Sequence, residues 1–301
     1  MDGLLVVDKP EGLTSFDVVR KIRGRLKRLG GPKKLKVGHA GTLDPFATGV
    51  LLICVGIGTK LARFLSDANK TYRVTLRLGE STTTDDREGE SLGAPVSVSH
   101  LDPDAVRMTL LSMQGEIMQR PPIYSALHVN GERAYKLARQ GEIVELEPRP
   151  VVLHSVDVQR VALPDVDFDV CASKGTYVRA ICRDLGQALD VGGHCLELRR
   201  LSSSGFDIEA AVSLKEILND WDEETLNTKL LSPSRMLRQL PVVEVEHDVA
   251  QKFRFGQKPP LMSERAPGTL VSVMDSGVLV CVGSVEDDGR IQSVRVMPTG
   301  S

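Results

Sequence analysis

Residues 70–78 read KTYRVTLRL, and from Thr71 to Leu78 polar and apolar side chains alternate without a break. One set comprises Tyr72, Val74, Leu76 and Leu78, and the other comprises Arg73, Thr75 and Arg77. Because successive side chains of a β-strand point to opposite faces, this pattern predicts a strand with one buried side and one solvent-facing side. Tyr72 is therefore expected on the core side of a sheet.

Other segments predict helices and strands in alternation. Apolar residues at helical spacing follow the N-cap candidates Thr14 and Ser15 and stop at Gly30-Gly31, which predicts a helix. Segment 49–56 reads as a buried strand, 59–65 as a short helix and about 102–114 as a longer one. Residues 167–189 read as a strand, a glycine turn and a helix.

The chain length and a change in sequence pattern near residue 241 predict two domains. A chain of 301 residues is roughly twice a typical domain. From Pro241 onward the sequence consists of short β-rich units separated by the turn signals DSG and DDG. We expect one domain over 1–240 and a second over 241–301, in which a small barrel would hide the edges of the short strands.

Composition excludes several classes of protein. With 41% hydrophobic and 26% charged residues, the chain is typical of a globular protein. It has no apolar run near the roughly 18 residues of a membrane span, and its first residues do not resemble a signal peptide, so we expect a cytoplasmic protein. The five cysteines lie far apart, mostly in apolar runs, and read as reduced core residues. No histidine and cysteine spacing suggests a metal site.

Positive charge is concentrated although the net charge is only −2. Segment 20–36 carries nine Lys or Arg and no acid. It is either a solvated helix face or an edge that contacts phosphates, and composition does not choose between them. A second basic segment, about 120–150, has proline at both ends and no clear apolar face, so we expect an inserted, mobile loop. Its basic residues include Arg120, Arg133, Lys136 and Arg139.

One carboxylate stands in an unusual segment, GHAGTLDPFATGVL at 38–51. Asp44 lies between Leu43 and Pro45, and an Asp-Pro pair favours a turn because proline restricts the residue before it. On this local pattern alone, a structural turn is the more frequent role for such an aspartate. The chain also lacks the glycine-rich patterns that cradle phosphates.

Five segments together change this interpretation: KPEGLTS at 9–15, GHAGTLDPFATGVL, KTYRV, SKGTYVRAICRDLG and LRRL at 198–201, in that order. With them the chain resembles the bacterial TruB family of tRNA pseudouridine synthases. The resemblance implies an α+β fold: a catalytic domain with a mixed, mostly antiparallel central sheet flanked by helices, and a small C-terminal PUA-like β-barrel. It also implies an isomerase without a cofactor or metal that acts on a T-loop uridine of tRNA, uridine 55, with Asp44 as catalyst.

The same match suggests roles for other residues. Arg179 is the candidate partner that keeps Asp44 charged and oriented. Tyr72 would stack on the flipped uracil, while Tyr177 and Leu198 would complete the pocket and His39 would bind the RNA loop. Whether Asp44 acts as a nucleophile or as a base stays open, since a carboxylate can do either.

The expected partner is tRNA, held by its T arm, with the insertion at about 120–150 and residues 241–301 adding contacts. We expect a monomer without an obligatory protein partner and without membrane contact. Two alternatives remain: a subunit of a guide-RNA-dependent modification complex, and a non-catalytic RNA-folding protein that kept the pocket. The presence of Asp44, Tyr72 and Arg179 together disfavours the second.

Overall fold

The computed structural model describes residues 1–124, 146–298 and, for the backbone alone, 128–129 and 132–133. The chain divides into two compact units. Unit 1 comprises Met1–Asp44, Val50–Ala68 and Ser203–Ser301, and unit 2 comprises Pro45–Gly49 and Asn69–Ser202. The chain passes between the units four times: after Asp44, within β3 (Thr48–Val55), after Ala68 and near the end of β10 (Gly193–Ser203).

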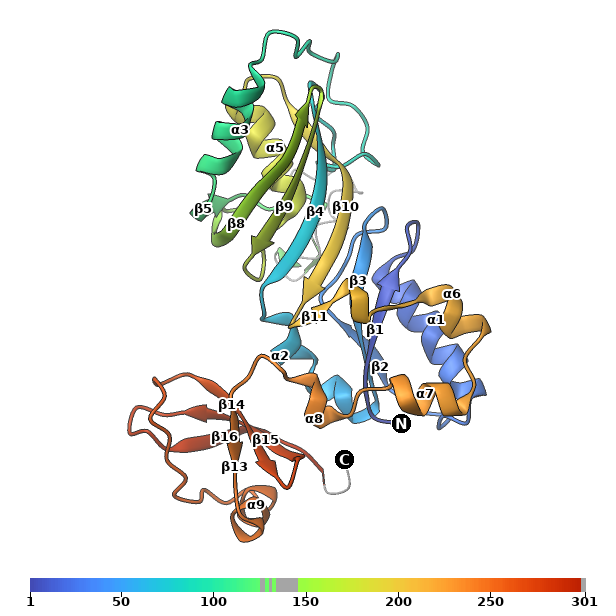
Figure 1. The fold of residues 1–301 in the computed structure, drawn as a ribbon, viewed down its shortest axis with the longest axis vertical. Coiled ribbons are helices and arrows are strands. Elements are labelled where there is room, and N and C mark those ends of the chain that lie inside the picture. The colour runs from blue at the N-terminus through green and yellow to red at the C-terminus, as the bar shows by residue number, and fades with distance from the viewer. Residues whose placement is uncertain (125–127, 130–131, 134–145, 299–301) are drawn as a thin grey trace. The chain divides into compact units, whose positions relative to one another are not determined.

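Unit 1 begins with a strand, a helix and a two-stranded antiparallel pair. These elements are β1 (Gly3–Lys9), α1 (Ser15–Arg28), β2 (Val37–Ala40) and β3, followed by the 3-10 helix η1 (Gly56–Lys60) and α2 (Ala62–Ser66). After residue 203 come β11 (Phe206–Asp207), η2 (Ile208–Ala210), β12 (Val212–Ser213), α6 (Leu214–Asn219), α7 (Glu223–Lys229) and α8 (Pro233–Met236). The strand order is β12-β1-β3, with β2 antiparallel to β3 (Figure 1).

Helix α1 is confirmed where the sequence predicts it. Thr14 is the N-cap, and it forms a capping box with Asp17 in which each side chain bonds the other residue's backbone N–H. The apolar face formed by Val18, Ile22 and Leu26 is buried, which leaves most of the basic residues on the opposite face. The helix thus presents its charge outward because its apolar stripe is fixed against the strands.

Unit 2 is built on long strands. They are β4 (Lys70–Leu78), β5 (Gly115–Gln119), β8 (Arg149–Ala162), β9 (Asp165–Ala172) and β10. The short strands β6 (His128–Val129) and β7 (Glu132–Arg133) pair with each other outside this sheet. The strand order is β3-β10-β4-β9-β8-β5, and β4, β9, β8 and β5 pair in antiparallel fashion. Helices α3 (Pro103–Ser112) and α5 (Val178–Ala188) contact each other and pack against β8 and β4 (Figure 1).

The structure confirms that alternate residues of β4 face the core and the solvent. Tyr72, Val74 and Leu76 are buried, whereas Arg73 is exposed. Strand β9 faces β4 in register, with Tyr72 opposite Val170 and Val74 opposite Phe168. The solvent-facing arginines of β4 pair with aspartates of β9, so both faces of this strand pair follow the sequence pattern.

The C-terminal part contains a second, smaller sheet. Its elements are β13 (Val242–Glu244), α9 (His247–Arg254), β14 (Leu270–Asp275), β15 (Val278–Val285) and β16 (Ile291–Val296), in the order β13-β14-β15-β16. Met274, Leu279 and Met297 from this region share one cluster of buried side chains with Leu4 and Phe64 from earlier in unit 1. Removing residues 241–301 would therefore expose apolar side chains elsewhere in unit 1.

These two sheets with their helices confirm the predicted α+β fold with a mixed, mostly antiparallel main sheet and a small β-rich C-terminal part. The five cysteines carry free thiols, and burial raises the pKa of Cys54 and Cys281 to about 12. Much of the predicted insertion, including Lys136 and Arg139, lies outside the described residues, as does the side chain of Arg133.

Candidate active site

The segment that carries Asp44 is fixed at both ends. Strand β2 holds His39 opposite Ile53 of β3, and His39 is half-buried. An irregular segment then leads to Asp44, which is also half-buried and ends the first part of unit 1. Asp44 is therefore neither sealed in the core nor fully surrounded by water.

A buried serine holds the backbone next to this aspartate. The Leu43 N–H donates to Ser15 Oγ at 2.8 Å, and Ser15 Oγ lies 3.0 Å from the Leu43 carbonyl oxygen, to which it donates. Ser15 is the first residue of α1 and is 2% exposed. The loop before Asp44 is therefore tied to the start of a helix that lies 28 positions earlier in the chain.

Residues 45–49, which belong to unit 2, are fixed by close packing. Gly49 has φ +100, and a Cβ at this position would lie 2.2 Å from the carbonyl oxygen of Arg200. Only glycine permits this approach of β3 to β10, where Arg200 pairs with Gly49. Phe46 is buried, with the Arg87 guanidinium 5.8 Å from the centre of its ring. The glycine and phenylalanine of the motif thus have structural roles.

Arg179 lies at the centre of a buried polar network in unit 2. It is the second residue of α5 and is 4% exposed. Its Nη1 donates to Asp86 Oδ2 at 2.8 Å and to the Thr84 carbonyl at 2.7 Å, and its Nη2 donates to the Tyr124 carbonyl at 3.0 Å. The guanidinium therefore joins α5 to the loop after β4 and to Tyr124, near the start of the predicted insertion.

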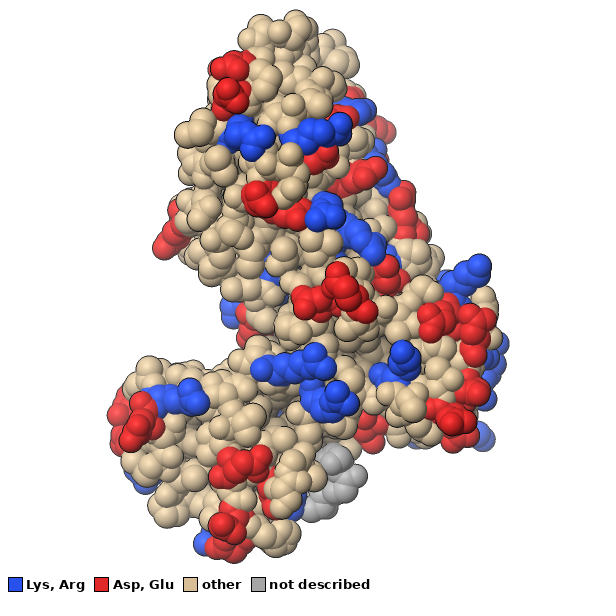
Figure 2. All heavy atoms as spheres, viewed as in Figure 1, with Lys and Arg blue, Asp and Glu red and all other residues tan. Residues whose placement is uncertain are grey.

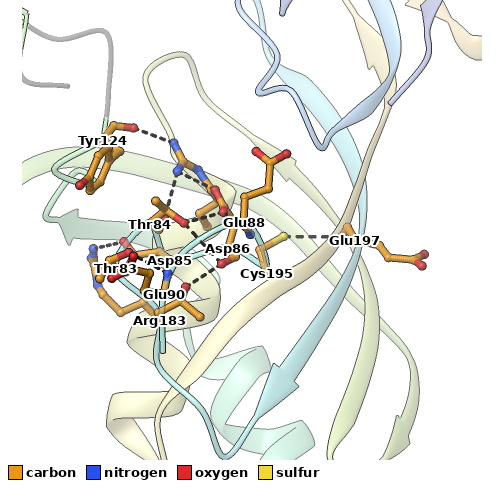
Figure 3. Close-up of polar contacts among 12 residues, drawn as sticks. Thr83, Thr84, Asp85, Asp86, Glu88, Glu90, Tyr124, Arg183, Cys195 and Glu197 are labelled. Atoms are coloured by element: carbon orange, nitrogen blue, oxygen red, sulfur yellow. Dashed lines mark hydrogen bonds and ion pairs between the residues drawn. The ribbon is translucent and has the colours of Figure 1, made fainter. Parts of the chain in front are cut away.

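The loop that carries Asp86 is held by its own hydrogen bonds (Figure 3). Asp86 Oδ1 accepts from Thr84 Oγ1 at 2.6 Å and from the Glu88 N–H at 3.0 Å. The loop is fastened to β10 because the Cys195 N–H donates to the Asp85 carbonyl and the Arg87 N–H donates to the Cys195 carbonyl. Asp86 is 3% exposed, so this carboxylate is presented to Arg179 in a rigid frame.

A second arginine repeats the arrangement one helical turn later. Arg183 Nη1 donates to Asp85 Oδ2 at 2.8 Å, and Arg183 Nη2 donates to the Arg120 carbonyl at 2.8 Å. Burial raises the pKa of Asp85, while the charges of Arg183 and Arg179 oppose this shift. Asp85 has φ +60, a conformation that aspartate tolerates better than most residues. Figure 3 shows Arg183 beside Asp85.

The aromatic and apolar candidates lie in the sheet and at the start of α5. Tyr72 on β4 is 8% exposed, and Leu198 on β10, the neighbouring strand, is 7% exposed. Tyr177 is the N-cap residue of α5 and is half-buried. The Tyr177 N–H donates to Gln119 Oε1 at 2.8 Å, and Gln119 Nε2 donates to the Tyr177 carbonyl at 3.1 Å. The buried Gln119 amide therefore fixes the backbone that carries Tyr177.

The sequence predicts six site residues, and unit 2 holds four of them: Tyr72, Tyr177, Arg179 and Leu198. Arg179 and Tyr177 come together in the first turn of α5, whereas Asp44 and His39 belong to unit 1. The pairing of Asp44 with Arg179 stays a prediction.

Sequence reasoning did not identify Asp86 or Gln119. The available signal for Asp86 was the spacing of Arg179 and Arg183, which puts both on one helix face, together with two adjacent acids in the polar loop TTTDD.

Among the residues that the structure describes, no group of three or more His, Cys, Asp and Glu side chains is arranged to hold a metal ion. No helix within the described ranges has the length and apolar character needed to cross a membrane.

Family models cover most of the chain. The model described as TruB family pseudouridylate synthase (N terminal domain) matches residues 27–178, and the model described as tRNA pseudouridylate synthase B C-terminal domain matches residues 179–240. The first of these matches alone spans half of the sequence.

Several curated proteins named tRNA pseudouridine synthase B are similar over most of the chain. The one from Geobacter sulfurreducens is 43% identical over 259 residues, which cover 86% of this chain and 83% of the relative. The one from Burkholderia lata is 41% identical over 306 residues, which cover 100% of this chain and 92% of the relative.

Solved structures with the same fold include one titled "Crystal Structure of a Cbf5-Nop10-Gar1 Complex". It has a TM-score of 0.76 and 25% identity, and the match covers 98% of this chain and 85% of that one. A second, titled "Structure of H/ACA RNP bound to a substrate RNA containing 2'-deoxyuridine", has a TM-score of 0.75 and 23% identity, with 99% and 86% coverage.

Proposed function

Since the chain belongs to the TruB family of pseudouridine synthases, we propose that it converts uridine 55, in the T loop of tRNA, to pseudouridine. The observation that carries this proposal is the similarity to relatives named tRNA pseudouridine synthase B, at 36% to 49% identity over most of the chain. The position of the uridine rests on the family resemblance of the motifs around Asp44, Tyr72 and Arg179.

The reaction breaks one bond and forms another within the same nucleotide. The bond from ribose C1' to uracil N1 is cleaved, the base turns, and C5 bonds to C1'. N1 gains a proton, and the hydrogen originally on C5 is lost to solvent. No electrons are gained or lost overall, so the chemistry requires a placed acid or base rather than a redox cofactor.

Asp44 is the proposed catalyst. A charged carboxylate near the sugar can attack C1' as a nucleophile or remove the 2' proton, and the proposal covers both routes. The half-buried position of Asp44 in a loop tied to α1 supports this role, because a held backbone limits the positions that the carboxylate can take.

Arg179 is the proposed partner of Asp44. A guanidinium offers five N–H donors, so it can bind Asp86 and a second carboxylate at the same time. In this role Asp86 and the two carbonyls would fix the plane of the guanidinium, and the guanidinium would keep Asp44 charged and oriented. Asp86 would then act on the reaction through Arg179.

The pocket is proposed to form around a flipped base. A uridine stacked in a folded RNA loop must leave the stack before its C1' can be reached. Tyr72 would provide the stacking surface, with Leu198 and Tyr177 as further walls, and His39 would contact the RNA loop. Tyr72 is 8% exposed, so its ring is held by the packing of β4 before any base binds.

Binding energy for tRNA must come from outside this pocket. Segment 20–36 is the proposed contact with phosphates of the T arm, because seven of its nine basic residues are exposed: Arg20, Lys21, Lys27, Arg28, Lys33, Lys34 and Lys36. Blue side chains appear at the edge of unit 1 beside α6 and α7, next to red acidic ones (Figure 2). The insertion and a separate domain over 241–301 are proposed to add contacts, in a monomeric, cytoplasmic enzyme.

The alternative is a guide-RNA-dependent subunit. Three of the matching solved structures are named as complexes with other components, but these chains are only 23% to 25% identical to this one. Identity of up to 49% to relatives named tRNA pseudouridine synthase B favours an enzyme that works alone on tRNA.

The test uses the purified full chain with unmodified tRNA and no added RNA or protein. Tritium release from C5-labelled uridine measures the isomerisation, and a transcript with cytidine at position 55 is the matched control substrate. We expect stoichiometric release from the first tRNA and none from the second. Equal release from both would reject position 55, and activity that appears only with an added guide RNA would favour the alternative.

A further inference from the structure

The hydroxyl of Ser15 makes both of its described hydrogen bonds to a single distant residue. It accepts from the Leu43 N–H at 2.8 Å and donates to the Leu43 carbonyl at 3.0 Å, although the two residues are 28 positions apart. Both side chains are buried, with Ser15 at 2% and Leu43 at 4% exposure. In a dry environment such bonds are costly to leave unmade, so the pair holds its geometry tightly.

The frame around Ser15 is rigid. The preceding residue, Thr14, is held by the capping box with Asp17. The turn from β1 into α1 is held by Lys9, whose Nζ donates to the carbonyls of Pro10 at 2.9 Å and Leu13 at 2.7 Å. Lys9 is fully buried, so this tie is not loosened by solvent. The start of α1 is thus a fixed support for Ser15.

The bonds to Leu43 act directly on the position of Asp44. The Leu43 carbonyl belongs to the peptide group that joins Leu43 to Asp44, so a bond to it fixes the plane of that peptide. On the other side, Pro45 restricts the backbone of Asp44 to extended conformations. The Asp44 Cα is therefore constrained from both directions, by one hydroxyl and by one proline ring.

We propose that Ser15 is a positioning residue for the Asp44 carboxylate in the isomerisation. This inference rests on the proposed function, because it assumes that Asp44 reacts with the sugar. Displacement of a reacting group by about 1 Å can cost about a hundredfold in rate. Loss of the Ser15 hydroxyl should therefore lower the rate of the chemical step more than it lowers tRNA binding.

The chain offers a matched control in Ser204. This serine is also 2% exposed and lies in unit 1, and its Oγ donates to the Leu65 carbonyl, away from the segment that carries Asp44. Ser204→Ala removes a hydroxyl of the same kind and the same burial as Ser15→Ala does. If the hydroxyls matter only for stability, the two variants should behave alike.

The experiment measures single-turnover tritium release, the tRNA dissociation constant and Tm for the full-length parent, Ser15→Ala, Ser15→Cys and Ser204→Ala. For Ser15→Ala we expect a rate about 10- to 100-fold below the parent and a dissociation constant within about twofold. The rate of Ser15→Cys should lie between those of the parent and Ser15→Ala, because a thiol is a weak hydrogen-bond donor and acceptor. Ser204→Ala should lose Tm to a similar extent and keep its rate within about twofold.

A rate for Ser15→Ala within about threefold of the parent would overturn the inference, as would an equal loss of rate in Ser204→Ala. If Ser15→Ala does not fold, Ser15→Cys provides the test. A rate of Ser15→Cys equal to that of the parent contradicts the inference, and a reduced rate with normal tRNA binding supports it. An inactive parent would instead reject the proposed function, so the two failures are distinguishable.

Discussion

Arg179 and Asp86 form a buried ion pair, with Nη1 and Oδ2 2.8 Å apart and each side chain 4% exposed. Two charges this far from water stabilise the fold only while both are present, and removing one partner typically costs about 3–5 kcal/mol. Substitutions of Arg179 will therefore affect stability as well as any role beside Asp44. An informative substitution must keep the positive charge at position 179 and change the shape of the group that carries it.

Arg179→Lys meets that requirement. An ammonium keeps the charge, but it cannot reach Asp86, the Thr84 carbonyl and the Tyr124 carbonyl at once in the plane of a guanidinium. We expect turnover to fall at least about a hundredfold, with tRNA binding largely kept. Steady-state tritium release and a binding titration measure the two effects.

Arg73→Lys is the control for this substitution. Arg73 also pairs with an aspartate, Asp169 at 3.0 Å, but it is 61% exposed. Its replacement should change stability by less than about 1 kcal/mol and leave turnover unaltered. Near-normal turnover of Arg179→Lys would break the proposed pair with Asp44.

Tyr72 can be tested by separating its ring from its hydroxyl. Tyr72→Leu removes the stacking surface, whereas Tyr72→Phe removes only the oxygen. We expect Leu to reduce turnover at least about a hundredfold, more than it reduces binding, because base flipping depends on the ring. A Phe variant with good activity would assign Tyr72 to stacking, and an inactive one would assign the hydroxyl to proton transfer.

Phe168→Leu serves as the comparison for a core aromatic. Phe168 is fully buried on β9, opposite Val74 of β4. Its replacement should lower Tm while the rate of the folded enzyme stays close to that of the parent. If both Tyr72 variants turn over normally, Tyr72 is a core residue like Phe168.

Elements with a strong local pattern could be predicted from the sequence. The face of β4 follows from strict alternation, and α1 follows from its helical spacing and the cap at Thr14. The candidate residues on α5 and β10 came from motif resemblance instead, because nothing in local propensity distinguishes Leu198 from an ordinary core leucine.

Contacts between distant residues could not be predicted in the same way. Asp86 bonds Arg179 across 93 positions, Gln119 bonds Tyr177 across 58, and Ser15 bonds Leu43 across 28. Each depends on how strands and helices pack, which a single sequence does not contain as a periodic signal. Ser15 is also accounted for as the first residue of a helix, so the sequence gives no reason to expect its hydrogen bonds to Leu43.

The basic segment predicts a salt effect. Replacing Lys33, Lys34 and Lys36 with Gln should weaken tRNA binding and reduce the slope of log affinity against log salt, by somewhat under about one unit for each phosphate that the protein no longer neutralises. Titrations at several salt concentrations measure the slope. A slope equal to that of the parent would show that these lysines belong to a solvated face.

The control for the salt experiment is Lys215→Gln with Lys229→Gln. Both lysines are exposed on α6 and α7, among acidic residues. Their neutralisation should leave the slope unchanged, because no phosphate is proposed to bind there. A slope that falls as much in this control would attribute the effect to net charge alone.

The ion pair between Asp165 and Arg77 should make the free energy of unfolding depend on pH. Arg77 donates to both oxygens of Asp165, at 2.8 and 2.9 Å, and these hydrogen bonds lower the pKa of Asp165 below its ordinary value. A carboxyl with a lowered folded-state pKa stabilises the fold above its ordinary pKa of 3.8, and this stabilisation is lost as the pH falls through the folded-state pKa. The pair is partly exposed, so solvent limits its strength.

We expect Asp165→Asn to lower the free energy of unfolding by up to about 1 kcal/mol at pH 7 and by progressively less below about pH 4. Urea unfolding at several pH values measures this difference. In an Arg77→Gln background the difference at pH 7 should be smaller, since the hydrogen bonds that lower the pKa of Asp165 are gone. A difference that grows as the pH falls would contradict the assignment.

The most direct test of the account is Asp44→Asn. The amide has nearly the same shape as the carboxylate, but it can neither attack C1' nor remove a proton, so fold and tRNA binding should be kept. Single-turnover tritium release from C5-labelled tRNA, with the enzyme in excess, isolates the chemical step. We expect a rate at least about a thousandfold below that of the parent at an unchanged tRNA dissociation constant. A folded Asp44→Asn enzyme with a rate within about tenfold of the parent would contradict it.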